Sequence, residues 1–193
     1  ADYLDKGDAL INRAVRAEFY PGSVFKVVTA AAAFESGMVS PRDYYYCSGS
    51  YSFDNGIEIG CLKPHGLVNF NSALALSCNG YFVNLVQKTG PELLGSMSRR
   101  LGLNCSLNER SNPVMAGNTA IGQQGIKVSP LQMARVYAVI ARSGLDIEPR
   151  QISLIMDQKG QEIVSYPAKS AVRVLDEAVA EMIKEGLQNA VLN

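Results

Sequence analysis

The segment from Val24 to Phe34 is apolar at almost every position, yet Lys26 lies inside it. A helix that is apolar on every side has to be buried, so this segment predicts a helix at the centre of the molecule. Lysine is rarely buried without a partner. Either the Lys26 stem runs along the helix and places its ammonium in water, or the amine has a chemical role inside the protein.

Ser23 lies three residues before Lys26 and directly after Pro21-Gly22. Side chains three residues apart share a helix face, so the hydroxyl and the amine are expected to approach hydrogen-bonding distance. Burial lowers the pKa of an amine, and a neutral amine can take a proton from a hydroxyl and make it a nucleophile. Free N–H groups at the helix start would stabilise an oxyanion. The alternative for Ser23 is a plain N-cap.

A second polar group, Ser77-Cys78-Asn79, lies within the apolar run from residue 73 to 86. Ser77 and Asn79 are two residues apart, so they do not share a helix face, and a local break would be needed to direct both into one cleft. The alternative is that Ser77 bonds a backbone carbonyl and Asn79 is exposed.

The composition argues against two function classes. Eighteen Lys and Arg residues balance eighteen Asp and Glu residues, so the chain lacks the net positive charge that non-specific nucleic-acid binding needs, and no nucleic-acid partner is expected. With a single histidine, His65, and no Cys-x-x-Cys pair, no metal or other cofactor is expected, and His65 is expected to be structural. Cys47 and Cys61 either form a disulfide or are two independent small hydrophobic residues. Cys78 and Cys105 are expected to be buried thiols.

Glycine, proline and capping residues mark the expected elements along the chain. The pattern predicts a single, mainly helical domain over residues 1–193 with little strand, because no repeat or low-complexity linker interrupts it. The first twenty residues are expected to be loop-like, and no segment is long and apolar enough to span a bilayer. Helices are expected over 23–36, 71–89, 92–101, 129–143 and 175–188, short strands and a turn at 54–56 over 41–63, and a hairpin over 151–166.

Four blocks of this sequence together resemble the class B penicillin-binding transpeptidases of the serine β-lactamase-like superfamily. Residues 18–30 contain the Pro-Gly-Ser-x-Phe-Lys core of the nucleophile motif, and residues 73–82 contain the Ser-x-Asn motif. Residues 12–14 and 121–134 resemble the stretches before and after these motifs. The resemblance covers nearly the whole chain.

The resemblance implies an α+β fold of which this chain holds the mainly helical portion, with a short β-hairpin region and most of the central antiparallel sheet missing. The third family motif, Lys-Thr-Gly on a strand, would follow a helix like that of residues 175–188. Lys88-Thr89-Gly90 spells the motif, but it lies at a predicted helix end, where Gly90 is expected to be a C-cap. The chain is therefore expected to be a partial transpeptidase domain, truncated before that strand.

The resemblance also implies a function. Ser23 would attack the D-alanyl-D-alanine amide of a peptidoglycan stem peptide and form an acyl-enzyme, with Lys26 as base, Ser77 as proton relay and Asn79 holding Lys26 and the substrate. β-Lactam antibiotics would acylate the same serine. The expected partners are stem peptides and the cell-wall synthesis machinery, at the extracytoplasmic face of a bacterial membrane, with an N-terminal anchor that is absent from this chain. The alternatives are a β-lactamase or β-lactam sensor of the same fold, or a catalytically silent scaffold.

Overall fold

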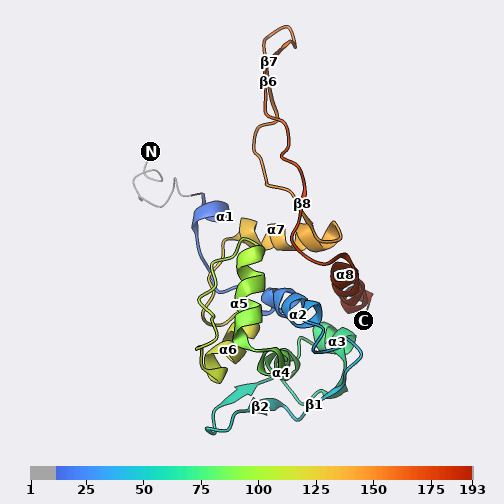
Figure 1. Ribbon diagram of the computed structural model, residues 1–193. Helices are drawn as coiled ribbons and strands as arrows, with labels where there is room; N and C mark the ends of the chain where they lie inside the picture. The colour runs from blue at the N-terminus through green and yellow to red at the C-terminus, as the bar shows by residue number, and fades with distance from the viewer. Residues whose placement is uncertain (1–11, 193) are drawn as a thin grey trace, which may run out of the picture.

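Figure 1 shows the computed structural model of the chain, which describes residues 12–192. In that part of the chain the strands form four two-stranded antiparallel sheets, and helices make up most of the body. The helices are α1 (Arg13–Arg16), the 3₁₀ turn η1 (Gly22–Phe25), α2 (Lys26–Glu35), α3 (Phe70–Ala75), α4 (Asn79–Thr89), α5 (Pro91–Arg100), α6 (Pro113–Ala120), α7 (Pro130–Ala141) and α8 (Glu177–Leu192). The strand pairs are β1 (Tyr45–Cys47) with β4 (Gly66–Val68), β2 (Ser50–Ser52) with β3 (Glu58–Gly60), β5 (Leu145–Asp146) with β8 (Val172–Arg173), and β6 (Leu154–Met156) with β7 (Glu162–Ser165).

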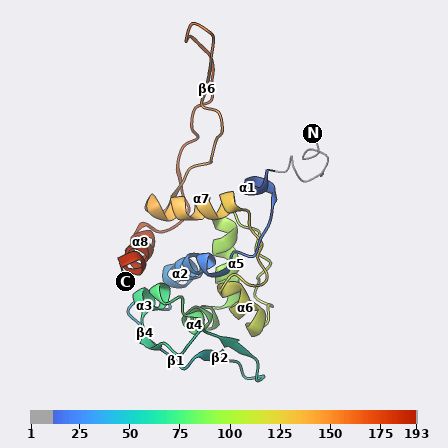
Figure 2. The ribbon, with the colours of Figure 1, turned by 180° about the vertical axis from the view of Figure 1, so that it is seen from behind.

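Helix α2 is the centre of the core, as its apolar sequence predicts. Every residue from Lys26 to Phe34 is buried. The helix packs against α4, α5 and α8, and it lies among them in both views of the ribbon (Figures 1 and 2). The ring of Phe34 meets that of Phe70 edge to face, with centroids 4.9 Å apart, which joins α2 to α3.

Capping residues set the helix starts where the sequence indicates them. Asn69 and Ser72 form a capping box at α3, and Ser129 and Gln132 form another at α7, each satisfying backbone N–H groups that the helix leaves free. The helices predicted over 92–101 and 129–143 correspond to α5 and α7, and the one predicted over 175–188 overlaps α8, which begins at Glu177 and ends at Leu192.

Three expectations about elements were wrong. The helix expected over 71–89 is two helices, because the chain turns at Ser77, whose φ is +51°. Helix α6 was not predicted, although Asn112 caps it and Pro113 occupies its first position, because its run of small and polar residues shows no apolar period. Short helix α1 replaces part of the expected N-terminal loop, because the Asn12 side chain accepts the N–H of Ala14. Residues 1–11 of the expected loop lie outside the described residues.

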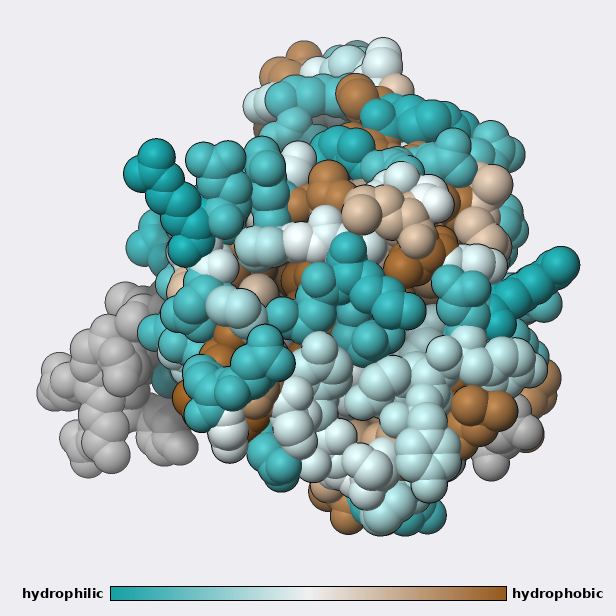
Figure 3. Space-filling view, turned by 60° about the horizontal axis from the view of Figure 1, so that its bottom comes forward, coloured by the Kyte–Doolittle hydropathy of each residue, from teal (hydrophilic) through white to brown (hydrophobic). Residues whose placement is uncertain are grey.

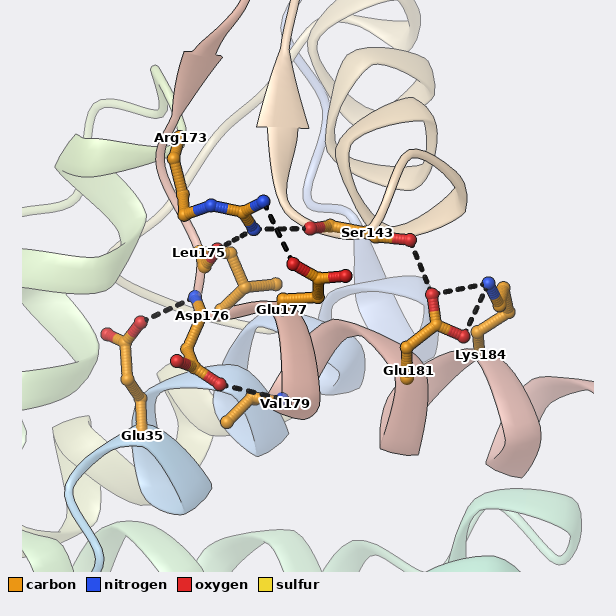
Figure 4. Close-up of polar contacts among 9 residues, drawn as sticks. All are labelled: Glu35, Ser143, Arg173, Leu175, Asp176, Glu177, Val179, Glu181 and Lys184. Atoms are coloured by element: carbon orange, nitrogen blue, oxygen red, sulfur yellow. Dashed lines mark hydrogen bonds and ion pairs between the residues drawn. The ribbon is translucent and has the colours of Figure 1, made fainter.

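Polar contacts anchor α8 to the ends of α2 and α7 (Figure 4). The Asp176 carboxylate accepts the N–H of Val179 at 3.2 Å and caps the helix, while its own N–H donates to Glu35 Oε1 at 2.9 Å. The Ser143 hydroxyl donates to Glu181. These contacts fix the helix whose apolar face covers α2 and α3.

The hairpin predicted over 151–166 is present as strands β6 and β7, which extend away from the helical body (Figures 1 and 2). Every residue of both strands is exposed. We call residues 151–166 the hairpin arm. On the face of the body seen in Figure 3, hydrophobic residues lie in separate patches between hydrophilic ones. Among residues 12–192, no helix is both long and apolar enough to cross a bilayer.

Candidate active site

Ser23 lies on the 3₁₀ turn η1, at the exposed start of the buried helix. In a 3₁₀ turn the side chains at i and i+3 eclipse each other, so Ser23 and Lys26 face the same side. The turn is held by the Gly22 N–H, which donates to Gly122 O at 3.0 Å. A Cβ at Gly122 would lie 2.3 Å from Gly22 O, so only glycine allows the two backbones to approach this closely.

Lys26 is 1% exposed, so its amine does not reach water along the helix. Its Nζ donates to Ser77 O at 2.7 Å, to Ser77 Oγ at 2.9 Å and to Asn79 Oδ1 at 2.7 Å. The three acceptors supply the partners that a buried amine needs. All three belong to the second motif, so the structure joins the two sequence motifs through one side chain.

The environment of Lys26 shifts the amine toward its neutral form. Burial lowers the pKa of Lys26 from 10.5 to about 8, against the opposing influence of the Cys78 and Cys61 thiols. With a pKa near 8, about a tenth of the amines are neutral at pH 7. An ordinary lysine would be neutral about three hundred times less often, so the buried site makes a usable general base.

Ser77 follows the C-cap of α3 and has a left-handed backbone conformation. Its N–H bonds Leu74 O at 3.1 Å and the Cys78 N–H bonds Ala73 O at 2.8 Å, which together form a Schellman motif. Glycine is the usual residue at this position, because a side chain is strained at positive φ. Here the side chain has a contact of its own, since Ser77 Oγ donates to Ser23 Oγ at 2.9 Å.

Lys26 therefore reaches Ser23 through Ser77. The sequence predicts a direct approach of hydroxyl and amine, but the hydrogen bonds run from Lys26 to Ser77 and from Ser77 to Ser23. The physical reason is that Lys26 points toward the turn between α3 and α4, where three acceptors hold it. The alternative for Ser23 is also excluded, because no side-chain hydrogen bond caps η1 or α2.

Asn79 is the first residue of α4 and lies beside Ser77 because of the turn between the two helices. Its Oδ1 accepts from Lys26, and its Nδ2 donates to Gly60 O at 2.8 Å. The break in the helix that Ser77 and Asn79 need in order to face the same site is therefore present. The structure brings Ser23, Lys26, Ser77 and Asn79 together, and their catalytic roles stay a prediction.

Lys88-Thr89-Gly90 ends helix α4, as predicted. The Thr89 hydroxyl bonds Leu85 O within the helix, and Gly90 has a φ of +90° at the C-cap. The motif is thus part of a helix terminus.

The structure matches neither of the two alternatives considered for Cys47 and Cys61. Cys47 and Cys61 are free thiols with Sγ atoms 3.7 Å apart, so they are neither bonded nor independent. Cys78 is buried as predicted and lies beside them, and His65 completes the group. We call these four residues the thiol–histidine cluster. Sequence reasoning missed it because the four positions are 14, 4 and 13 residues apart and match no short metal-binding pattern. Cys105 is buried elsewhere in the core.

An exposed serine that is linked through a second hydroxyl to a buried amine of lowered pKa defines a class of site, the serine nucleophile with a lysine base. Such a site is suited to acyl transfer, in which the serine oxygen attacks a carbonyl carbon.

Comparison with known proteins identifies the family. The family model "Penicillin binding protein transpeptidase domain" matches residues 2–193, and the chain belongs to this family. Penicillin-binding protein PbpB of Mycolicibacterium smegmatis is 29% identical over 93% of this chain and 30% of its own length. Peptidoglycan D,D-transpeptidase PbpA of the same organism is 30% identical over 83% of this chain and 36% of its own length.

A solved structure gives the same result for the fold. Penicillin-binding protein A of M. tuberculosis, as its ceftriaxone acyl-enzyme complex, superposes with a TM-score of 0.87 and 25% identity over 97% of this chain and 46% of that one. The expected likeness to the helical portion of a penicillin-binding protein is therefore confirmed. The chain spans about a third of the length of the curated relatives it matches.

Proposed function

We propose that this chain is a partial transpeptidase domain, residues 1–193, of a peptidoglycan D,D-transpeptidase, and that it carries the nucleophile. The observation that supports this proposal most strongly is the hydrogen-bonded series from buried Lys26 through Ser77 to exposed Ser23. The names of the relatives PbpA and PbpB point to the same chemistry.

In this mechanism neutral Lys26 accepts the Ser23 proton through Ser77 while Ser23 Oγ attacks the carbonyl carbon of a D-alanyl-D-alanine amide. The backbone N–H of Ser23 itself, in the first turn of η1, would donate to the oxyanion and stabilise it. When the C–N bond breaks, Ser77 returns the proton to the leaving D-alanine amine. The amine of a second stem peptide then attacks the acyl-enzyme carbonyl and loses a proton to Lys26 through Ser77. The C–O bond to Ser23 breaks, Ser23 Oγ takes up that proton, and the cross-link is released.

Asn79 positions the base in this mechanism. Its Nδ2 donates to Gly60 O and its Oδ1 accepts from Lys26, so the amide holds the lysine amine beside Ser77. β-Lactams present a strained amide to the same serine and would form a stable acyl-enzyme. The protein would act with the cell-wall synthesis machinery at the extracytoplasmic face of a bacterial membrane, held there by an N-terminal anchor.

Covalent labelling by a fluorescent penicillin tests this function. We expect one label per chain on Ser23, none in Ser23→Ala and a rate at least a hundredfold lower in Lys26→Ala. Ser96→Ala changes an exposed serine on α5 and is the matched control, which should label like the unchanged chain.

The same assay on the natural full-length protein separates the alternatives. If the full-length protein labels and this chain does not, Ser23 needs segments outside this chain in order to react. Rapid loss of the label by hydrolysis would indicate a β-lactamase. Absence of labelling in both would contradict the proposal and leave a silent scaffold.

A further inference from the structure

We propose that Cys47, Cys61, His65 and Cys78 form a structural zinc site directly behind the turn that carries Ser77 and Asn79. This proposal goes beyond the acyl-transfer function and does not depend on it. It also revises the expectation, drawn from the sequence, that the chain holds no metal.

Three of the distances within the thiol–histidine cluster match the edges of a tetrahedral zinc site. The Sγ atoms of Cys47 and Cys61 are 3.7 Å apart, and those of Cys61 and Cys78 are 3.9 Å apart. Cys47 Sγ lies 3.6 Å from His65 Nδ1. A tetrahedron with Zn–S bonds of about 2.3 Å and a Zn–N bond of about 2.0–2.1 Å has S···S edges of about 3.8 Å and S···N edges of about 3.6 Å. All four ligand atoms lie within 4.8 Å of one another.

A disulfide fits the same atoms poorly. It needs an S–S bond of about 2.05 Å, so two sulfur atoms would have to move together by more than 1.5 Å while the third thiol and the imidazole kept no bonding partner. The donor set, three thiols and one imidazole, is one of the common structural zinc sets. Four protein ligands fill a tetrahedral coordination shell, so the ion would serve structure rather than catalysis.

Zinc binds cysteine as the thiolate and histidine as the neutral imidazole, so the ion would displace the thiol protons as it binds.

The ion would join three separate segments at the catalytic turn. Cys47 ends strand β1, Cys61 and His65 lie between β3 and β4, and Cys78 is the N-cap of α4. Cys78 lies between Ser77 and Asn79 in the chain, and the Gly80 N–H donates to Cys61 Sγ at 3.4 Å. Zinc would therefore fix the start of α4, and with it the two side chains that hold Lys26.

The test measures metal binding directly. The full chain is purified with a thiol reductant and its zinc content is measured; it is then stripped with a chelator and titrated anaerobically with Co²⁺ and with Zn²⁺. We expect one ion per chain, and for Co²⁺ the absorption bands of thiolate ligation and tetrahedral geometry. Cys61→Ser and His65→Ala should each weaken binding at least tenfold and change the Co²⁺ spectrum. Cys105→Ser, which alters the buried thiol outside the cluster, should bind like the unchanged chain.

Two outcomes would overturn the proposal: no ion taken up by the reduced chain, or binding that is the same in His65→Ala as in the unchanged chain. His65 is only partly buried, so this variant tests the site even if a cysteine variant fails to fold. Metal content is read independently of penicillin labelling. If the chain binds zinc and neither it nor the full-length protein labels, the proposed function is contradicted and the metal site still stands.

Discussion

At the scale of single residues, Ser77 meets two opposing demands. Its backbone has a φ of +51°, which favours glycine, and its hydroxyl is the link between Lys26 and Ser23. Strain of this kind is typical of functional sites, where a side chain is kept because its chemistry is needed.

This conflict predicts opposite effects on stability and activity. Ser77→Gly and Ser77→Ala both remove the hydroxyl, so both should lose most penicillin labelling. Glycine relieves the strained φ and alanine does not, so the glycine variant should be more stable than the alanine variant by about 1 kcal/mol. Denaturant unfolding of the two variants measures this difference. Equal stability, or normal labelling in either variant, would contradict the role given to Ser77.

The sequence identifies some of these residues for a definite physical reason. An apolar helix must be buried, so Lys26 is conspicuous from the sequence alone, and Ser23 shares its face by spacing. The partner of Lys26 is 51 residues away, and local spacing carries no information about which distant acceptor a buried amine finds. The thiol–histidine cluster is missed for the same reason.

At the scale of elements, the turn that carries the nucleophile depends on a close approach of two backbones. Gly122 lies against Gly22, and a Cβ at Gly122 would come within 2.3 Å of Gly22 O and 2.6 Å of Gly22 N. The antiparallel bridge between Phe19 and Val128 ties the same region to the segment before α7, and the hydrogen bond from the Tyr137 hydroxyl to Val24 O ties it to α7 itself.

Gly122→Ala should therefore displace η1 and destabilise the fold by about 2–4 kcal/mol, because backbone atoms cannot move aside as a side chain can. Gly37→Ala is the matched control. Its φ of +69° is close to the +72° of Gly122, but no atom lies within 4 Å of an added Cβ, so only the backbone strain of about 1 kcal/mol applies. Thermal unfolding and labelling of both variants check the prediction. Equal losses in the two would show that the contact with Gly22 is unimportant.

Helix ends follow from the sequence more reliably than helix interiors. Asn69, Ser129 and the glycines that follow α2, α4 and α5 mark ends through local hydrogen bonds and positive φ values, which depend only on nearby residues. The break at Ser77 is hidden, because serine replaces the glycine that normally signals a Schellman turn.

At the scale of the whole molecule, the hairpin arm stands apart from the helical core (Figure 1). Its strands are exposed on both faces and carry apolar side chains, among them Ile163 at 61% and Met156 at 57% exposure. Strands with open edges and exposed apolar side chains tend to pair with other chains.

We therefore predict that the arm promotes self-association and adds little to stability. The double variant Met156→Lys with Ile163→Lys should reduce concentration-dependent association in sedimentation velocity, and should change the free energy of unfolding by no more than about 0.5 kcal/mol. Met38→Lys is the control, because Met38 is 62% exposed but lies outside the arm, and it should leave association unchanged. A compact monomer at every concentration of the unchanged chain would contradict the prediction.

The central claim is that Lys26 is neutral often enough to accept a proton from Ser23. An NMR titration of ¹³C-labelled lysine, with the Lys26 signal assigned by its absence in Lys26→Arg, measures this without requiring turnover. We predict a midpoint near pH 8, and a labelling rate that rises with pH up to that midpoint and levels off above it, because only the neutral amine can act as base. A midpoint near the ordinary value of 10.5 would show that the amine is charged at neutral pH and would contradict the account.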